Sequence, residues 1–279
     1  MKNIIVLGSK GMLGQMVCLY FSKNGYNIIE FNTRFTEDNS NLYFTELNKL
    51  EDGFVINCIG RIKQKSEDAF NLFLSNTIFP LALSRSLKKK HLLIHPSTDC
   101  VFDGNTDSAY NLNAPHTAND VYGLSKSLGE TAIKNSVNSI IVRVSIIGPD
   151  NNSNKGLLSW FLSNPQESLL NGYTNHYWNG ITTLEWCKIV NSIISNEKLF
   201  SKYKKEGIVQ LGTAEIYSKF KMLNIFNEVY KTNFKITSSE VDYTNRCLQP
   251  IIKSNSLEIQ MNELIDFLAL AYNIKFKNT

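Results

Sequence analysis

The fold is decided near the start of this 279-residue chain, by the stretch Ile4-Ile5-Val6-Leu7-Gly8-Ser9-Lys10-Gly11-Met12-Leu13-Gly14. A short apolar run that ends in glycine is typical of a buried parallel strand. Three glycines then recur as G-x-x-G-x-x-G, and apolar residues at helical spacing follow them. Glycines allow a tight turn and a close approach of the backbone, so a strand, turn and helix in this order can hold a dinucleotide pyrophosphate on the helix N-terminus. We expect the cofactor to contact this turn at Gly8, Lys10, Gly11, Met12, Leu13 and Gly14.

Strand and helix patterns alternate through the first half of the chain. The expected strands are 26–31, 54–59, 92–95 and 139–144, and the expected helices are 66–87 and 122–134. Pro80 marks a kink in the first of these helices, or a boundary between two. Strands that alternate with helices form a parallel sheet covered on both faces. The predicted fold class is therefore α/β, with a doubly wound parallel (Rossmann-type) sheet.

The polar stretch 148–154 is the clearest domain boundary, because the strand–helix rhythm changes after it. Helical patterns dominate beyond it, and strand patterns are short and scattered. We predict a dinucleotide-binding domain over 1–149, rejoined by about 180–215. A smaller mixed C-terminal lobe, formed by 150–179 and 216–279, is expected to bind the substrate.

Composition limits the class of protein. Hydrophobic residues make up 43% and charged residues 19%, which is ordinary for a soluble globular protein, and a net charge of +4 is too small to indicate nucleic acid. No stretch approaches the roughly 20 apolar residues of a membrane span, and the first apolar run is too short for a signal peptide. Five cysteines without a CxxC pair indicate reduced thiols. We expect a cytoplasmic protein with no metal site; the oligomeric state is not readable, and a homodimer is one candidate.

The end of the second strand bears on the choice of cofactor. NAD sites usually place an acidic residue there, where it holds the ribose hydroxyls. This chain reads Phe31-Asn32-Thr33-Arg34 at that place, with no carboxylate at the tip. Arg34 could make a bidentate contact with a 2′-phosphate. We therefore expect Asn32 and Arg34 to contact the cofactor, and we favour NADP(H) over NAD(H).

Three residues further along could carry proton transfer. Tyr122 and Lys126 lie four apart on an expected helix and so share one face. A nearby ammonium group favours the phenolate and lowers the pKa of a tyrosine, which is otherwise near 10. Thr98 follows an expected strand, at the sheet edge where α/β proteins bind ligands. Its hydroxyl could hydrogen-bond the reacting oxygen.

At these residues the chain resembles the extended short-chain dehydrogenase/reductase superfamily, and within it the dTDP-4-dehydrorhamnose reductase branch. Residues 97–104, S-T-D-C-V-F-D-G, match that branch's S-T-D-x-V-F-D-G segment. Residues 122–130, Y-G-L-S-K-S-L-G-E, match its Y-G-x-S-K-x-x-G-E helix. Asn76 with Pro80, and 143–145, also match in type and order. The resemblance covers roughly the first 150 residues well and continues faintly beyond.

The resemblance implies a reaction and roles for single residues. Tyr122 would donate the proton, Lys126 would assist it and hold the nicotinamide ribose, and Thr98 would bind the sugar oxygen. The implied cofactor site also includes Cys58, Gly60 and Asn76. Two departures concern the sugar: Cys100 stands where the branch usually has tyrosine, and 111–116 replaces a proline-rich acidic segment. Related 4,6-dehydratases carry Thr-Asp-Glu where this chain has Thr-Asp-Cys, so dehydration is not expected.

We therefore predict NADPH-dependent reduction of a nucleotide-linked 4-keto-6-deoxysugar, in surface polysaccharide synthesis. A nucleotide-sugar epimerase with tightly bound NAD, and a non-catalytic regulatory subunit that binds NADP, remain as alternatives. The aromatic and amide-rich loop 172–180 suits a sugar or base, and two cations could meet a diphosphate. The expected substrate contacts are Asp99, Cys100, Val101, Phe102, Lys155, Asn175, His176, Trp178 and Arg246.

Overall fold

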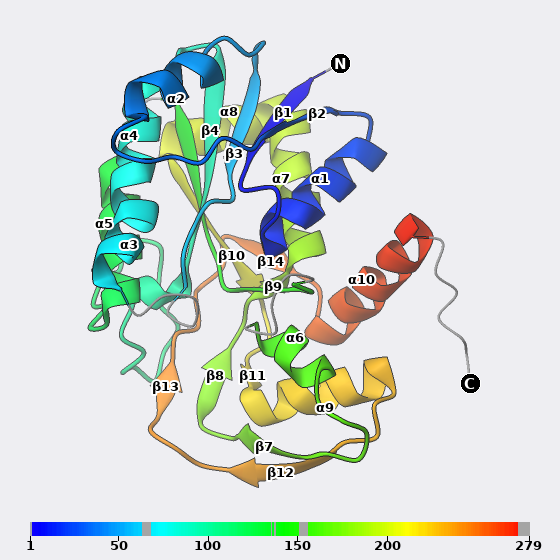
Figure 1. The fold of residues 1–279 in the computed structure, drawn as a ribbon. Helices are drawn as coiled ribbons and strands as arrows, with labels where there is room; N and C mark the ends of the chain where they lie inside the picture. The colour runs from blue at the N-terminus through cyan, green and yellow to red at the C-terminus, as the bar shows by residue number, and fades with distance from the viewer. Residues whose placement is uncertain (1, 63–67, 135, 137, 151–155, 273–279) are drawn as a thin grey trace.

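A seven-stranded parallel sheet forms the centre of the computed structural model, which describes residues 2–62, 68–134, 136, 138–150 and 156–272 (Figure 1). The strand order is β14-β10-β5-β4-β3-β1-β2. All paired neighbours in it run parallel. The strands are β1 (Asn3–Leu7), β2 (Asn27–Phe31), β3 (Gly53–Asn57), β4 (His91–Ser97), β5 (Ser139–Arg143), β10 (Ile208–Thr213) and β14 (Ile252–Ser254). This sheet confirms the predicted doubly wound α/β fold.

Helices cover both faces of the sheet, which explains why its central strands are buried along almost their whole length and are mostly apolar. On one face α1 (Met12–Lys23), α7 (Thr183–Ser195), α8 (Glu197–Glu206) and α10 (Leu257–Tyr272) contribute to one large apolar core. On the other face α2 (Ser40–Leu47), α4 (Phe79–Ser86) and α5 (Val121–Lys134) bury a second core against the sheet. No helix in the described part of the chain is long and apolar enough to cross a membrane.

A smaller mixed lobe lies beyond the carboxyl ends of the large sheet (Figure 1). Its strands form a three-stranded sheet in the order β11-β8-β13 and the pair β12-β7, and a further pair, β6-β9, lies at the junction with the large sheet. The strands are β6 (Ile146–Ile147), β7 (Leu169–Tyr173), β8 (His176–Trp178), β9 (Ile181–Thr182), β11 (Tyr217–Ser218), β12 (Lys235–Ser239) and β13 (Thr244–Asn245). Two helices, α6 (Leu157–Leu162) and α9 (Lys219–Tyr230), pack with them. The lobe therefore faces the carboxyl ends of the strands, where the predicted site residues lie.

Two elements differ from the ranges expected from sequence. The long helix expected over 66–87 is divided in the described residues into α3 (Ala69–Phe73), a π-helical turn η2 (Leu74–Ile78) and α4. Pro80 sits in the first turn of α4, where its missing N–H costs little. Strand β14 falls within the range expected for the small lobe but pairs with β10 at the edge of the large sheet. The domain division itself stays a prediction.

Candidate active site

The turn after β1 has the geometry that its glycines require. Gly8 has a φ of +78°, a left-handed conformation that side chains other than glycine rarely adopt. The N–H of Gly11 donates to the Gly8 carbonyl at 3.1 Å, which closes the turn. A Cβ built on Gly14 would lie 2.2 Å from the Gly8 carbonyl oxygen, so α1 can pack this closely only with glycine there. The turn thus leaves the N-terminus of α1 open to a phosphate.

A cavity of about 390 Å³ lies above this turn and at the end of β2. It collects several residues predicted to bind the cofactor, and Ser9 donates to the Asn32 side chain at 3.1 Å in its wall. Among the described residues that line it there are three cations and no carboxylate; Glu30 lines a separate groove beside α1. The predicted residues here are Gly8, Lys10, Gly11, Asn32, Arg34, Cys58 and Gly60.

A second cavity of about 380 Å³ continues from the first, and the two share lining residues such as Gly11 and Arg61. It contains the predicted proton-transfer residues Thr98, Tyr122 and Lys126. Asn76, from the π-helical turn, also lines it and is held from both sides. Its side chain accepts from the Arg61 N–H at 3.0 Å and donates to the hydroxyl of Ser125 at 3.0 Å. Met12 and Leu13 complete the set of predicted cofactor residues in this cavity.

The three predicted proton-transfer residues meet at the carboxyl end of β4. The Thr98 hydroxyl donates to the Asp99 carboxylate at 2.9 Å. Burial raises the pKa of Tyr122, the charges of Cys100 and Asp99 add to this, and a hydrogen bond with Thr98 opposes it. This direction is opposite to the lowering that the sequence predicted from the Lys126 ammonium, because burial of the phenol dominates. Tyr122 therefore keeps its proton at neutral pH, as a proton donor must.

Lys126 lies one helical turn after Tyr122 and donates from Nζ to the Pro96 carbonyl at 2.9 Å. Burial lowers its pKa to about 8, although the Glu130 carboxylate opposes this shift. At neutral pH the ammonium is mostly charged. It can therefore stabilise negative charge on a nearby oxygen, and its remaining N–H groups can bind ribose hydroxyls.

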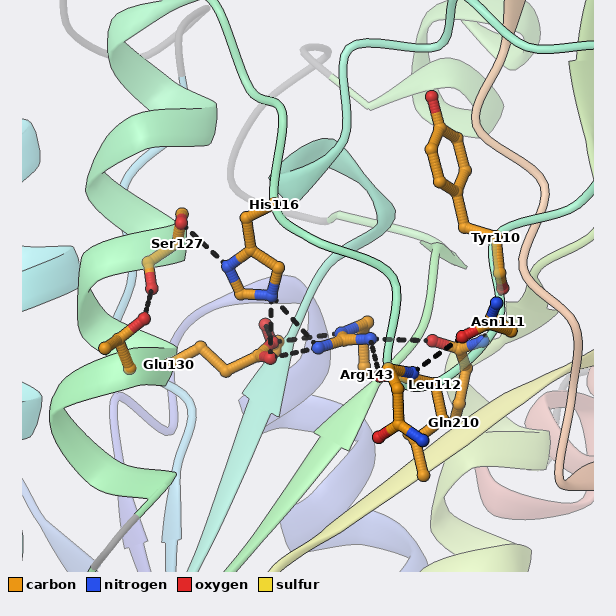
Figure 2. Close-up of polar contacts among 11 residues, drawn as sticks. Tyr110, Asn111, Leu112, His116, Ser127, Glu130, Arg143 and Gln210 are labelled. Carbon is orange, nitrogen blue, oxygen red and sulfur yellow. Dashed lines mark hydrogen bonds and ion pairs between the residues drawn. The ribbon is translucent and has the colours of Figure 1, made fainter.

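A buried polar network connects α5 to the neighbouring strands of the sheet (Figure 2). Glu130, in the second half of α5, accepts from the Ser97 hydroxyl at 2.5 Å and from Arg143 Nε at 3.1 Å. Arg143 also donates to the Gln210 side chain at 2.9 Å, and His116 lies 3.1 Å from Glu130. The network joins β4, α5, β5 and β10, so it fixes the strand end that carries Thr98.

The predicted substrate contacts fall into two groups. Asp99 and Cys100 line the second cavity, and Arg246 approaches Cys100, with its Nη1 4.0 Å from the thiol and its Nε donating to the Phe102 carbonyl at 2.9 Å. The side chains of Val101 and Phe102 are fully buried, because this loop turns inward and Phe102 stacks on Tyr110 with ring centroids 4.0 Å apart.

No residue of the loop 172–180 lines either of the two cavities, in contrast to what its composition predicts. Trp178 is only 4% exposed and packs in the core, so it does not offer a free ring face for stacking. Asn175 and His176 hydrogen-bond to the carbonyls of Val241 and Asp242, which holds together the edge of the small lobe. Lys155 lies outside the described residues. The roles of these residues toward a substrate stay predictions.

Two cations near the cavities were missed by sequence reasoning. Arg61 lines both cavities; its place just after the carboxyl end of β3 could have indicated it. Lys219 begins α9, and its ammonium faces Asp99 and Cys100. It comes from the other lobe, and no spacing along the chain relates it to the site.

Comparisons with known proteins agree with this geometry. The family model of the RmlD substrate binding domain matches residues 1–168. No match was found among curated protein sequences.

Among solved structures, one similar to this chain is a dTDP-4-dehydrorhamnose reductase from Clostridium acetobutylicum, with a TM-score of 0.76 and 19% identity over 95% of this chain and 99% of that one. The same reductase from Bacillus anthracis, in complex with NADP, has a TM-score of 0.80 and 15% identity over 95% and 99%. A UDP-glucose 4-epimerase from Thermotoga maritima, with UDP-glucose, has a TM-score of 0.73 and 14% identity over 97% and 99%.

The fold, the glycine turn and the Tyr–Lys helix place this protein in the extended short-chain dehydrogenase/reductase superfamily, as its sequence predicted. Within it, the chain belongs to the RmlD substrate binding domain family. The predicted resemblance to the dTDP-4-dehydrorhamnose reductase branch is thereby confirmed. The predicted enzyme class, an NAD(P)-dependent nucleotide-sugar oxidoreductase, agrees with this membership.

Proposed function

We propose that this protein reduces the keto group of a nucleotide-linked 4-keto-6-deoxysugar with NADPH. The observation that carries the proposal is the placement of Thr98, Tyr122 and Lys126 together in one cavity that continues into the cofactor turn. A dinucleotide bound along both cavities would have its phosphates at the turn and its nicotinamide near Tyr122. Reduction of a neighbouring sugar carbonyl then needs only a hydride and a proton.

The residues of the turn fit a dinucleotide. The space that a Cβ on Gly8 or Gly14 would fill is left open by glycine, and the first N–H groups of α1 are available to phosphate oxygens. Lys126 can hold the nicotinamide ribose. When bound, the reduced nicotinamide supplies the hydride.

Residues of this chain supply the rest of the chemistry. The Thr98 hydroxyl, which donates to Asp99 in the structure, would turn to donate to the sugar carbonyl oxygen and orient it toward Tyr122. The Tyr122 phenol gives its proton to that oxygen as negative charge develops there, because burial keeps the phenol protonated until then. The Lys126 ammonium stabilises the phenolate that remains, and a solvent proton restores the phenol.

The lining of the first cavity supports NADPH over NADH. Lys10, Arg34 and Arg61 line it, and no described lining residue is acidic. A 2′-phosphate at the end of β2 would meet cations there, whereas NADH would lack the carboxylate that usually holds its free ribose hydroxyls. This is the same preference that residues 31–34 indicate.

The direct test is oxidation of NADPH by the purified protein with a panel of enzymatically prepared dTDP-, UDP-, GDP- and CDP-4-keto-6-deoxysugars. We expect stoichiometric oxidation with at least one of them and none with the corresponding 4-hydroxy sugars. Cofactor that remains bound through purification, with interconversion of sugar epimers and no net oxidation, would instead support an epimerase. No turnover together with tight NADP binding would support the regulatory alternative.

A further inference from the structure

Lys219 is placed at the junction of the two lobes by a rigid local structure. It is the first residue of α9 and follows β11, which pairs with β8. Ser218 caps the helix by accepting from the Lys221 N–H at 3.1 Å. A Cβ on Gly172 would lie 2.6 Å from Cα of Phe220, so β7 packs directly against this first turn. The backbone that carries Lys219 therefore has little freedom to move.

The Lys219 side chain reaches from the small lobe toward the large one. Its ammonium lies 5.9 Å from the centroid of the Trp178 ring. The titratable groups that face it are Asp99, Cys100 and Cys247; burial lowers its pKa, and these three oppose that shift. Within the described residues, its ammonium makes no hydrogen bond and no ion pair within 4 Å. A half-buried cation with unused donors is thus directed at the substrate end of the site.

Arg246 reaches the same place from β13. Its Nη1 is 4.0 Å from the Cys100 thiol, and its Nε is occupied by the Phe102 carbonyl. Asp99 is the one carboxylate among the groups that face Lys219. Beside Cys100 the three cations Lys219, Arg246 and Lys126 outnumber the two carboxylates Asp99 and Asp120, so the local excess is positive. Such a site suits a ligand with two or more negative charges next to the sugar.

We propose that Lys219, together with Arg246, binds the diphosphate of the nucleotide-sugar substrate and so selects substrates that carry a diphosphate. This inference rests on the proposed function, since it concerns the same substrate. The Trp178 ring orients the lysine stem and keeps the ammonium partly desolvated, which strengthens a contact with phosphate oxygens.

The test measures binding of nucleotides without turnover. The probes are dTDP, UDP, GDP and CDP, each compared with its own nucleoside, by calorimetry in the presence of NADP. For the tightest diphosphate, Lys219→Gln should weaken binding by about ten- to a hundredfold, the range for loss of a charge-assisted contact. Binding of the nucleoside should be unchanged, and Lys219→Arg should retain most of the affinity.

Lys221→Gln is the matched control, because Lys221 lies on the same helical turn and over an aromatic ring, 5.0 Å from the centroid of Tyr217. It should leave diphosphate affinity within a factor of two or three. An unchanged thermal midpoint and NADPH affinity in Lys219→Gln would exclude a folding defect.

Unchanged diphosphate affinity in Lys219→Gln would overturn the inference and leave the proposed function standing. A loss of stability without a loss of affinity would also overturn it, since Lys219 would then serve only as a counter-charge for Asp99. Binding of none of the four diphosphates to the parent would contradict the proposed function itself, and the inference with it.

Discussion

Replacement of Glu130 by glutamine should destabilise this protein more than the small change in shape suggests. The Glu130 side chain is 1% exposed and accepts hydrogen bonds from Ser97 and from the Arg143 guanidinium. Glutamine keeps the volume but removes the charge. Arg143, which is 2% exposed, would then remain buried without a counter-charge, and the new amide would place a donor against it.

The loss in the free energy of unfolding follows from the pKa shift of Glu130 and, independently, from the cost of breaking a buried ion pair. Burial would raise the pKa of Glu130, but hydrogen bonds from His116, Arg143 and Ser97 together with the Arg143 charge hold it at about 2, below its ordinary 4.5. A carboxyl group shifted by this much on folding contributes about 3 kcal/mol at neutral pH. Removal of one partner from a buried ion pair costs about 3–5 kcal/mol in other proteins. We therefore expect a loss of at least about 3 kcal/mol.

The assay is urea denaturation of parent and variant at neutral and at acidic pH. Because the folded-state pKa is lowered, the contribution is complete above pH 4.5 and is lost as the pH falls toward about 2. The parent should lose stability through this window, and the variant should lose less. The surface variant Glu263→Gln breaks a 2.8 Å contact with Lys188 between side chains that are more than a third exposed. It should cost under about 1 kcal/mol. Equal losses of stability in the two variants would show that the buried Glu130–Arg143 pair contributes no more than an exposed one.

Three further predictions concern the cofactor and the proton donor. Gly14→Ala should abolish cofactor binding or folding, because the new Cβ would lie 2.2 Å from the Gly8 carbonyl oxygen. Gly25→Ala is the control: there is open space around its Cβ, but its φ is +80°. This variant should lose only modest stability, and its cofactor titrations should be unchanged. Arg34→Ala should weaken NADPH binding by about tenfold or more and leave NADH binding nearly unchanged in fluorescence titrations, and equal losses would contradict the role of Arg34. Because the pKa of Lys126 is lowered to about 8, kcat/KM for ketone reduction should decline as the pH rises through about 8. Lys126→Arg should remove that decline while lowering the rate. A pH profile of the parent that is flat through this range would contradict the role of Lys126.

The features that could be predicted from sequence are those set by local backbone chemistry. The strand, glycine turn and helix at 3–23 follow from residues that are adjacent in the chain. The spacing of Tyr122 and Lys126 places them on one helical face, and the position of Thr98 at a strand end brings it to the same edge. These residues line the two cavities because the parallel strands bring all their carboxyl ends to the same side of the sheet.

The features that could not be predicted depend on contacts between distant segments. Val101 and Phe102 lie in the motif nearest the site, yet the loop turns them into a small core with Leu248, from the other lobe. Trp178 lies in the core because β8, which carries it, pairs with β11 and β13. Lys219 reaches the site only because α9 packs against β7. In each case the tertiary contact, rather than the local pattern, decides where the side chain lies.

Protonation of a sugar carbonyl by Tyr122, as NADPH reduces it, can be followed with an isotope label and a Tyr122→Phe variant. The protein is incubated with NADPH deuterated at the transferred position and with the 4-keto sugar that it oxidises NADPH against fastest. We expect one deuterium at C4 of the product per NADP formed, and a rate about 10²–10⁴-fold lower in Tyr122→Phe with NADPH affinity unchanged. Product without deuterium, or a Tyr122→Phe rate within a few-fold of the parent, would contradict this mechanism.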